Sequence, residues 1–96
     1  MEKNFFEFNI NHNVFVKLTK EGIAIWKKKF EEYGISDDFP FEKKMELYTD
    51  ENGLTHFQMH EFMDVFGEEF SVGMPHQIME KNMMYFSLED FSLKTM

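Results

Sequence analysis

The sequence of 96 residues contains no cysteine and no arginine. Without cysteine, the chain has no disulfide scaffold, no thiolate zinc site and no cysteine nucleophile. Without arginine, its ten basic residues are all lysines. The chain also has 18 acidic residues, so its formal net charge is -8. This balance opposes binding to nucleic-acid phosphates, which requires basic side chains that displace counterions. We therefore expect no direct DNA binding.

Long apolar runs are also missing, since no unbroken stretch approaches the roughly 20 residues that span a bilayer. The first residues lack the basic segment, apolar core and small-residue cleavage site of a secretory signal. Hydrophobic residues make up 43% of the chain, including 13 phenylalanines and nine methionines, which is enough for a packed core. We expect a single domain over residues 1–96, no membrane contact and a cytoplasmic location.

In the first half, alternating apolar residues predict strands at residues 6–10 and 14–18. Thr19 suits the N-cap of a helix, because its hydroxyl can accept from an unpaired backbone N–H. The helix that follows has an apolar stripe at spacings of three, four and three, and we expect it to end at Gly34. This stripe consists of Ile23, Trp26, Phe30 and Tyr33. Residues 34–42 are predicted to form a loop.

In the second half, alternation predicts a strand at 45–49, followed by a turn at 50–53 that ends in Asn-Gly. Thr55 and Gln58 have the spacing of a capping box. The second helix has its own apolar stripe and closes at Gly67; the stripe is Met59, Phe62, Met63 and Phe66.

Alternation further predicts a strand at 84–88, paired with 77–79 through a turn at 80–82; a helix over 77–86 is the alternative. The expected fold class is α+β, with a small antiparallel sheet and two amphipathic helices packed on one face.

Two histidines lie four residues apart in the predicted second helix, as in zinc-binding helices. His56, His60 and Asp64 would share one face of that helix. However, Phe57 stands where a metalloprotease motif has glutamate, and no third and fourth ligands are visible. We interpret these residues as an ordinary polar face and expect no metal.

Other motifs with known chemistry are absent. The turn at 50–53 fails the calcium-loop pattern, because Leu54 and Thr55 occupy the positions that need Asp or Asn and then glycine. Hydrolase elbows and phosphate-binding glycine loops do not occur. The adjacent acidic pairs lie in solvated stretches, whereas acid–base catalysis needs carboxylates in contrasting environments. We therefore expect no enzyme activity and no cofactor.

The negative charge is concentrated in one half of the chain. Residues 1–44 hold eight lysines and eight acids, whereas residues 45–96 hold two lysines and ten acids and carry the whole net charge. Such asymmetry can steer a basic partner to one side. Carboxylates spaced along a rigid element can also imitate a phosphate backbone. The alternative is a solvated surface that keeps a phenylalanine-rich protein soluble.

The acidic residues around the predicted second helix are the candidate partner-binding site. Glu61, Asp64 and Glu68 have the spacing i, i+3 and i+7, while two more acids lie in the turn before the helix and a sixth directly follows Glu68. These residues are Asp50, Glu51, Glu61, Asp64, Glu68 and Glu69.

Two segments resemble a family of small proteins encoded by tailed phages and prophages. The first is Phe-Asn-Ile-Asn at 8–11 with Val-Phe-Val-Lys-Leu-Thr at 14–19, Gly22 and Trp26. The second is Phe-Gln-Met-x-Glu-Phe-Met-x-x-Phe-Gly at 57–67, which is similar to that family's aromatic-Gln-Leu-x-Glu-Leu-Met-x-x-Phe-Gly block. The resemblance covers most of residues 8–78 and implies expression in the cytoplasm of a bacterial host, but no chemistry.

Small acidic phage proteins without catalytic motifs are often inhibitors of host defence, including anti-CRISPR proteins. The resemblance and the charge together favour a non-enzymatic inhibitor that binds a CRISPR effector nuclease or its guide complex through the acidic half. One alternative is a sponge for a nucleotide immune signal, lined by aromatic residues and by Lys27, Lys28, Lys43 or Lys44. Another is a phage accessory or assembly protein whose acidic surface is only solubilising.

Aromatic residues outside the main stripes also predict a homodimer, because a core of this size would leave some of them uncovered. The residues concerned are Phe39, Phe41, Phe70 and Phe91.

Overall fold

The computed structural model describes residues 2–33, 39–70 and 77–95. Its elements are β1 (Asn4–Phe8), β2 (Asn13–Leu18), α1 (Lys20–Glu32), α2 (Phe41–Tyr48), β3 (Thr55–Gln58), α3 (Met59–Phe66), the 3-10 turn η1 (Gly67–Glu69), β4 (Met79–Phe86), the 3-10 turn η2 (Leu88–Asp90) and β5 (Phe91–Thr95). Helices combined with antiparallel sheets confirm the α+β class, although these ranges include three α-helices rather than two. No helix within them is long and apolar enough to cross a membrane.

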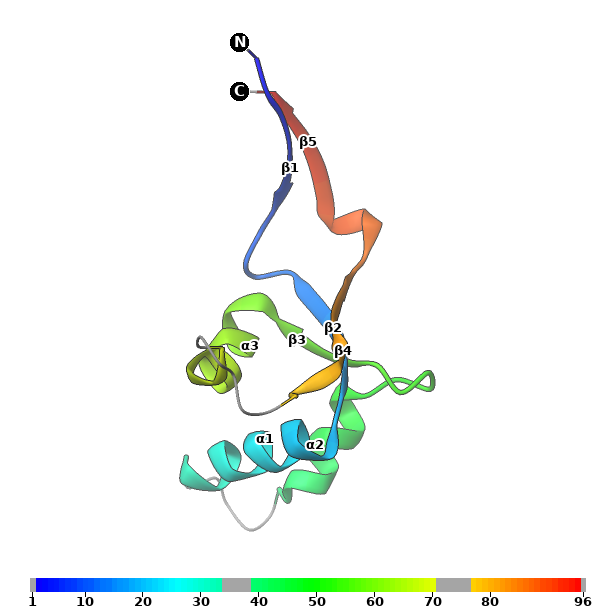
Figure 1. Ribbon diagram of the computed structural model, residues 1–96. Helices are drawn as coiled ribbons and strands as arrows, with labels where there is room; N and C mark the ends of the chain where they lie inside the picture. The colour runs from blue at the N-terminus through cyan, green and yellow to red at the C-terminus, as the bar shows by residue number, and fades with distance from the viewer. Residues whose placement is uncertain (1, 34–38, 71–76, 96) are drawn as a thin grey trace.

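The strands form two separate sheets. β2 is the centre of a three-stranded antiparallel sheet in the order β3-β2-β4, and together with α1, α2 and α3 this sheet makes the body of the protein. β1 and β5 pair with each other in a two-stranded antiparallel ribbon. The ribbon runs away from the body, with both chain ends at its tip (Figure 1). It accounts for the elongated dimensions of 54 × 31 × 25 Å.

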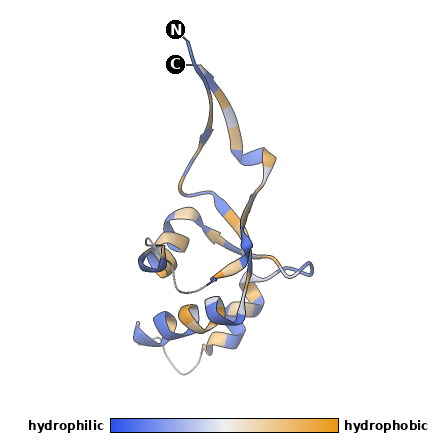
Figure 2. Ribbon diagram, in the orientation of Figure 1, coloured by the Kyte–Doolittle hydropathy of each residue, from blue (hydrophilic) through white to orange (hydrophobic). Residues whose placement is uncertain are grey.

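The core lies between one face of the three-stranded sheet and the helices. Val14 and Val16, alternate residues of β2, are fully buried because they share the face that the helices cover. The ring of Trp26 lies edge-on to Phe41 of α2 and to Phe57 of β3, both at 4.9 Å between centroids. Hydrophilic and hydrophobic residues alternate along α1 and α2, as expected for helices with one buried side (Figure 2).

The start of α1 agrees with the sequence prediction. Thr19 is its N-cap, and the Thr19 hydroxyl accepts from the Gly22 N–H at 3.1 Å. The Thr19 N–H donates to the Ile78 carbonyl at 2.9 Å, which ties α1 to the chain entering β4. A Cβ atom at Gly22 would lie 2.2 Å from that carbonyl oxygen, so only glycine fits this close approach. Gly34, the predicted end of the helix, lies outside the described residues.

The predicted strand at 45–49 is wrong, because Phe41–Tyr48 forms helix α2. Phe41, Met45 and Tyr48 have the helical spacing i, i+4, i+7, and all three contact the core. Burial of Phe41 against Trp26 and the neighbouring ring of Phe30 favours the helix over the strand. The chain becomes extended only at Thr49, which bridges to Thr55.

The predicted capping box at Thr55 and Gln58 is also wrong, because these residues form β3 beside β2. α3 begins at Met59 without a side-chain cap. Its first N–H groups are satisfied by the turn before β2 instead. The Met59 N–H donates to the His12 carbonyl at 3.0 Å, and the His60 N–H donates to the Ile10 carbonyl at 3.1 Å.

The apolar stripe of α3 is partly as predicted. Phe62 and Phe66 are buried, but Val65 is buried where Met63 was expected, and Met63 is 59% exposed. α3 ends at Phe66 with Gly67 as its C-cap, as predicted; the φ of Gly67 is -55°, and the chain continues into η1.

Residues 79–86 form one long strand, β4, rather than the hairpin or helix predicted there. β4 runs through Lys81 and Asn82, whose φ angles are +57° and +55°. The register between β2 and β4 shifts at this point, so the two residues form a bulge rather than a turn. Leu88, expected in a strand, lies in η2.

At the other end of the chain, the strand predicted at 6–10 is displaced to β1. It ends at Phe8 because Asn9 begins a turn, in which the Asn9 side chain accepts from the N–H of Asn11 at 2.8 Å.

Candidate functional site

The acidic residues of α3 and η1 lie on a helix that is anchored firmly in the core. Phe62 and Phe66 are almost fully buried, which fixes the direction in which the residues between and after them point. Asp64 and Glu68 are exposed, and Glu61 is half-buried. Glu68 belongs to η1 rather than to α3, so the predicted line of three carboxylates extends over two consecutive elements.

Glu61 is engaged within the protein. The Tyr48 hydroxyl of α2 donates to Glu61 Oε2 at 3.1 Å. Burial raises the pKa of Tyr48 above its usual value of 10.0, and the charge of Glu61 and this hydrogen bond raise it further, since both disfavour a second negative charge. Glu61 therefore helps to join α2 and α3, and only part of its carboxylate faces solvent.

Lysines of α1 and α2 lie beside the same acids. Lys29 Nζ is 3.7 Å from Glu68 Oε2, and the Glu68 side chain is 81% exposed. A small cleft of about 120 Å³ lies where the three helices meet, with lysines of α1 and α2 on one wall and carboxylates of α3 on the other. Its lining includes Lys29, Lys44, Glu61 and Asp64. The Lys29 side chain is 24% exposed, so the pair lies at the edge of the surface, where such a pair contributes little to stability.

Asp50 and Glu51 lie elsewhere. Asp50 Oδ1 accepts from the N–H groups of Asn52 and Leu54 at 2.8 and 3.0 Å, and Gly53 adopts a φ of +79° to close the turn. The turn lies before β3 and α3 begins after it. The four residues of β3 therefore separate the turn from the start of α3 by about 13 Å, at the usual rise per residue of a strand. In Figure 1, the turn projects on the opposite side from α3.

The six predicted residues thus form two groups. Glu61, Asp64, Glu68 and Glu69 make up the α3 group, in which Glu69 is half-buried; Asp50 and Glu51 make up the turn group. Asp50 shapes its own loop, and Glu51 is exposed.

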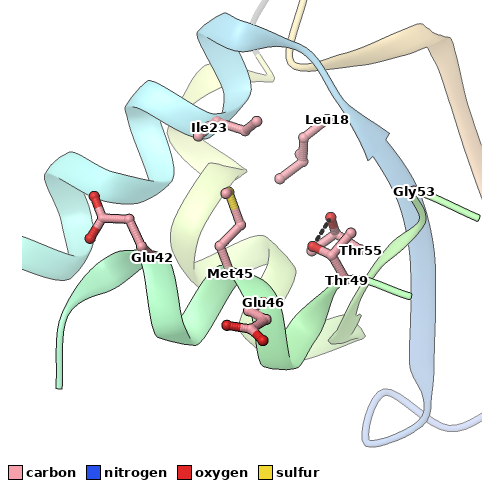
Figure 3. Close-up of a pocket in the computed structure, with 8 residues that line it drawn as sticks. All are labelled: Leu18, Ile23, Glu42, Met45, Glu46, Thr49, Gly53 and Thr55. Carbon is pink, nitrogen blue, oxygen red and sulfur yellow. Dashed lines mark hydrogen bonds between the residues drawn. The ribbon is translucent and has the colours of Figure 1, made fainter. Parts of the chain in front are cut away.

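A pocket that the sequence analysis missed opens between α1, α2 and the turn, with a volume of about 410 Å³. Leu18, Ile23 and Met45 point into it, as Figure 3 shows. Two hydroxyls, those of Thr49 and Thr55, are hydrogen-bonded to each other at 3.0 Å at one side. Two glutamates of α2 complete the lining. They are Glu42 and Glu46.

Glu42 and Glu46 are four residues apart on one side of α2. The prediction of a loop and a strand for this segment concealed that spacing. The helical period of Phe41, Met45 and Tyr48 was the signal that would have revealed it.

The histidines do not share a helix face. His56 lies in β3, where its ring stacks on Tyr48 with centroids 5.3 Å apart and planes 9° apart. His60 lies in the first turn of α3 and bonds Gln58 at 2.8 Å. Within residues 2–33, 39–70 and 77–95, no three histidine or acidic side chains are grouped to hold a metal ion.

Two of the lysines considered for a nucleotide pocket have partners within the chain. Lys27 Nζ is 3.6 Å from Glu42 Oε1. Lys44 Nζ lies over the rings of Phe30 and Tyr48, at 5.4 and 5.2 Å from their centroids. Each of these two lysines is therefore engaged within the chain.

The chain was compared with protein families, with curated proteins and with solved structures. No family model matches it, and neither of the other two comparisons finds a match.

Proposed function

We propose that this protein is a non-enzymatic, phage-encoded inhibitor of bacterial immunity that binds a CRISPR effector nuclease through the α3 group. The observation that carries the proposal is the display of Asp64 on the core-anchored helix α3 and of Glu68 on η1 directly after it, in the half of the chain that holds the whole net charge of -8. A rigid row of carboxylates resembles a short stretch of phosphate backbone. Guide-loaded nucleases present basic channels that bind such a backbone.

Rigidity is what distinguishes this row from an ordinary solvated surface. α3 has one side packed into the core and its first N–H groups bonded to the turn before β2. Glu61 is positioned further by Tyr48. Carboxylates that are already ordered lose less conformational entropy on binding, which favours affinity for a partner with fixed basic groups.

The two groups of acids have different roles in this proposal. The α3 group makes the contact, whereas Glu51 contributes only to long-range attraction, since it projects at the other end of β3. Asp50 maintains the turn. The resemblance of residues 57–67 to a block found in small phage proteins supports the setting inside an infected bacterium.

The proposal is tested by adding the purified protein to a panel of guide-loaded effector nucleases and measuring target cleavage at low and at physiological salt. We expect inhibition of at least one nuclease, weaker at the higher salt because the contact is electrostatic. Full cleavage by every nuclease at both salts would contradict the proposal and favour a phage accessory role.

A further inference from the structure

The ribbon of β1 and β5 has two chemically different faces. In the antiparallel register, Phe6 lies opposite Leu93 and Phe8 opposite Phe91. Since successive residues of a strand point to opposite faces, these four apolar side chains share one face. The other face carries Phe5, Glu7, Ser92 and Lys94.

Much of the apolar face is open to solvent. Phe6 is 75% exposed, Leu93 68% and the adjacent Leu88 of η2 89%. Together with Phe91 they line a shallow hollow of about 310 Å³. At the base of the ribbon, Phe8 and Phe91 pack on Phe86 of β4, with ring centroids 5.0 and 5.7 Å from it. The apolar surface therefore extends outward from the body along the ribbon.

The ribbon needs cover to be stable. An isolated pair of strands is marginal in water at best, and a hydrophobic face normally has to pack on another element. No short turn joins these two strands, because they come from opposite ends of the sequence. Among the described residues, β1 and β5 pair only with each other.

Charge indicates what covers this face. Glu7 and Lys94, the charged residues within the two strands, lie on the other face with their charged atoms 3.9 Å apart. The ribbon is thus neutral in a molecule of charge -8. A basic partner would gain little from the two strands, whereas a second copy offers strands that are equally apolar and neutral. The like charges nearest to the face are those of Glu89 and Asp90, which follow Leu88 in η2.

The exposed apolar area suits a small, concentration-dependent dimer, because it is little more than half of what each partner contributes to a standard interface. If a large apolar side chain has about 200 Å² of surface, Phe6, Leu88 and Leu93 expose roughly 450 Å² in each copy. Each partner in a standard interface contributes about 800 Å². Phe86, which is 38% exposed, and the neighbouring backbone add to the apolar area of each copy.

We propose that two copies of this chain form a homodimer in which the apolar faces of their ribbons pack against each other about a two-fold axis. This arrangement leaves the α3 groups of both copies free, so it does not depend on the proposed function. Of the four aromatic residues from which a dimer was expected, Phe91 lines this face and Phe70 is exposed elsewhere, after η1, whereas Phe41 is buried in the core and Phe39 is half-buried against it.

Sedimentation velocity of the full chain, over a range of concentrations, tests the proposal with a matched pair of variants. We expect the wild type to have twice the chain mass of 11.6 kDa. Phe6→Glu should sediment as a monomer, because it places charge in the interface. Phe5→Glu, on the other face and opposite Lys94, should remain a dimer. A monomeric wild type, or a Phe6→Glu variant that still dimerises, would overturn the proposal.

Because Phe6→Glu could instead melt the ribbon, a second test keeps the wild-type charge of the apolar face. The chain has no cysteine, so single substitutions provide unique sites for a bifunctional thiol cross-linker. Leu93→Cys, on the apolar face, should give covalent dimers, whereas Lys94→Cys, on the other face of the ribbon, should not. Equal cross-linking of both variants, or of neither, would contradict the interface. If the wild type were monomeric and Phe6→Glu abolished nuclease inhibition, the face would bind the nuclease rather than a second copy.

Discussion

The Tyr48 hydroxyl of α2 donates a hydrogen bond of 3.1 Å to the Glu61 carboxylate of α3. This bond joins α2, which was predicted to be a loop and a strand, to α3, which carries Glu61 and Asp64. Tyr48 also stacks on His56 and lies 5.8 Å from the ring of Trp26, so the bond connects the surface row to the aromatic core.

Replacement of Glu61 by glutamine should lower the pKa of Tyr48. The substitution removes the negative charge that disfavours tyrosinate, while burial, the largest cause of the rise, remains. The pKa should therefore fall toward its usual value without reaching it. Tyrosinate absorbance as a function of pH, compared with the same titration of Tyr48→Phe, measures the change. An unchanged titration would show that Glu61 does not interact with the phenol.

The same pKa shift predicts how stability depends on pH. Because the pKa of Tyr48 is higher in the folded than in the unfolded chain, its protonated form stabilises the fold. That contribution is complete below the unfolded value of about 10 and is lost as pH rises through the folded pKa. Urea unfolding at alkaline pH should show a steeper loss for the wild type than for Tyr48→Phe. Parallel curves would contradict the assignment.

Gly22→Ala should destabilise the protein by about 1–3 kcal/mol, because the new methyl group would overlap the Ile78 carbonyl oxygen and push β4 from α1. Gly67→Ala is the matched control. Gly67 has a helical φ of -55° and free space around its Cβ position, so alanine should stabilise by about 0.4–1 kcal/mol. Urea denaturation of both variants provides the comparison. Equal effects would show that the approach of α1 to β4 is looser than described.

Asp50→Ala should lower stability by about 1 kcal/mol, since it removes a carboxylate that accepts two backbone N–H groups of the turn. Glu51→Ala removes the neighbouring exposed carboxylate and should leave the free energy of unfolding within about 0.5 kcal/mol of wild type. Thermal unfolding monitored by circular dichroism distinguishes the two. Similar melting temperatures would indicate that the Asp50 bonds contribute nothing to the turn.

Local signals predicted β2 and the start of α1 correctly. Val14 and Val16 alternate over a strand with one buried face, and the Thr19 cap needs only residues of its own turn. The prediction of a strand at 45–49 failed because residues 41–49 satisfy both periods: Met45, Leu47 and Thr49 alternate, while Phe41 and Met45 also fit a helix. Packing of Phe41 on Trp26, which is distant in sequence, decided between them.

Distant contacts also explain what the sequence could not predict at the candidate site. The N–H groups that begin α3 find their acceptors in the turn before β2, almost half the chain away, so Thr55 was free to join a strand. Likewise, the pairing of Glu68 with Lys29 and of Glu61 with Tyr48 depends on how three helices meet. The identities of the acidic residues could be proposed from sequence, but their division into two groups required the fold.

Charge reversal within the α3 group tests most directly whether these carboxylates bind the nuclease. Asp64→Lys with Glu68→Lys changes the net charge by the same amount as Glu2→Lys with Glu80→Lys, and all four carboxylates are exposed. Nuclease cleavage should be measured with each double variant, after circular dichroism has shown that both fold. We expect at least a tenfold loss of inhibition for the first pair, equivalent to about 1.4 kcal/mol of binding free energy, and little change for the second. Equal inhibition by both double variants would contradict a role for the α3 group.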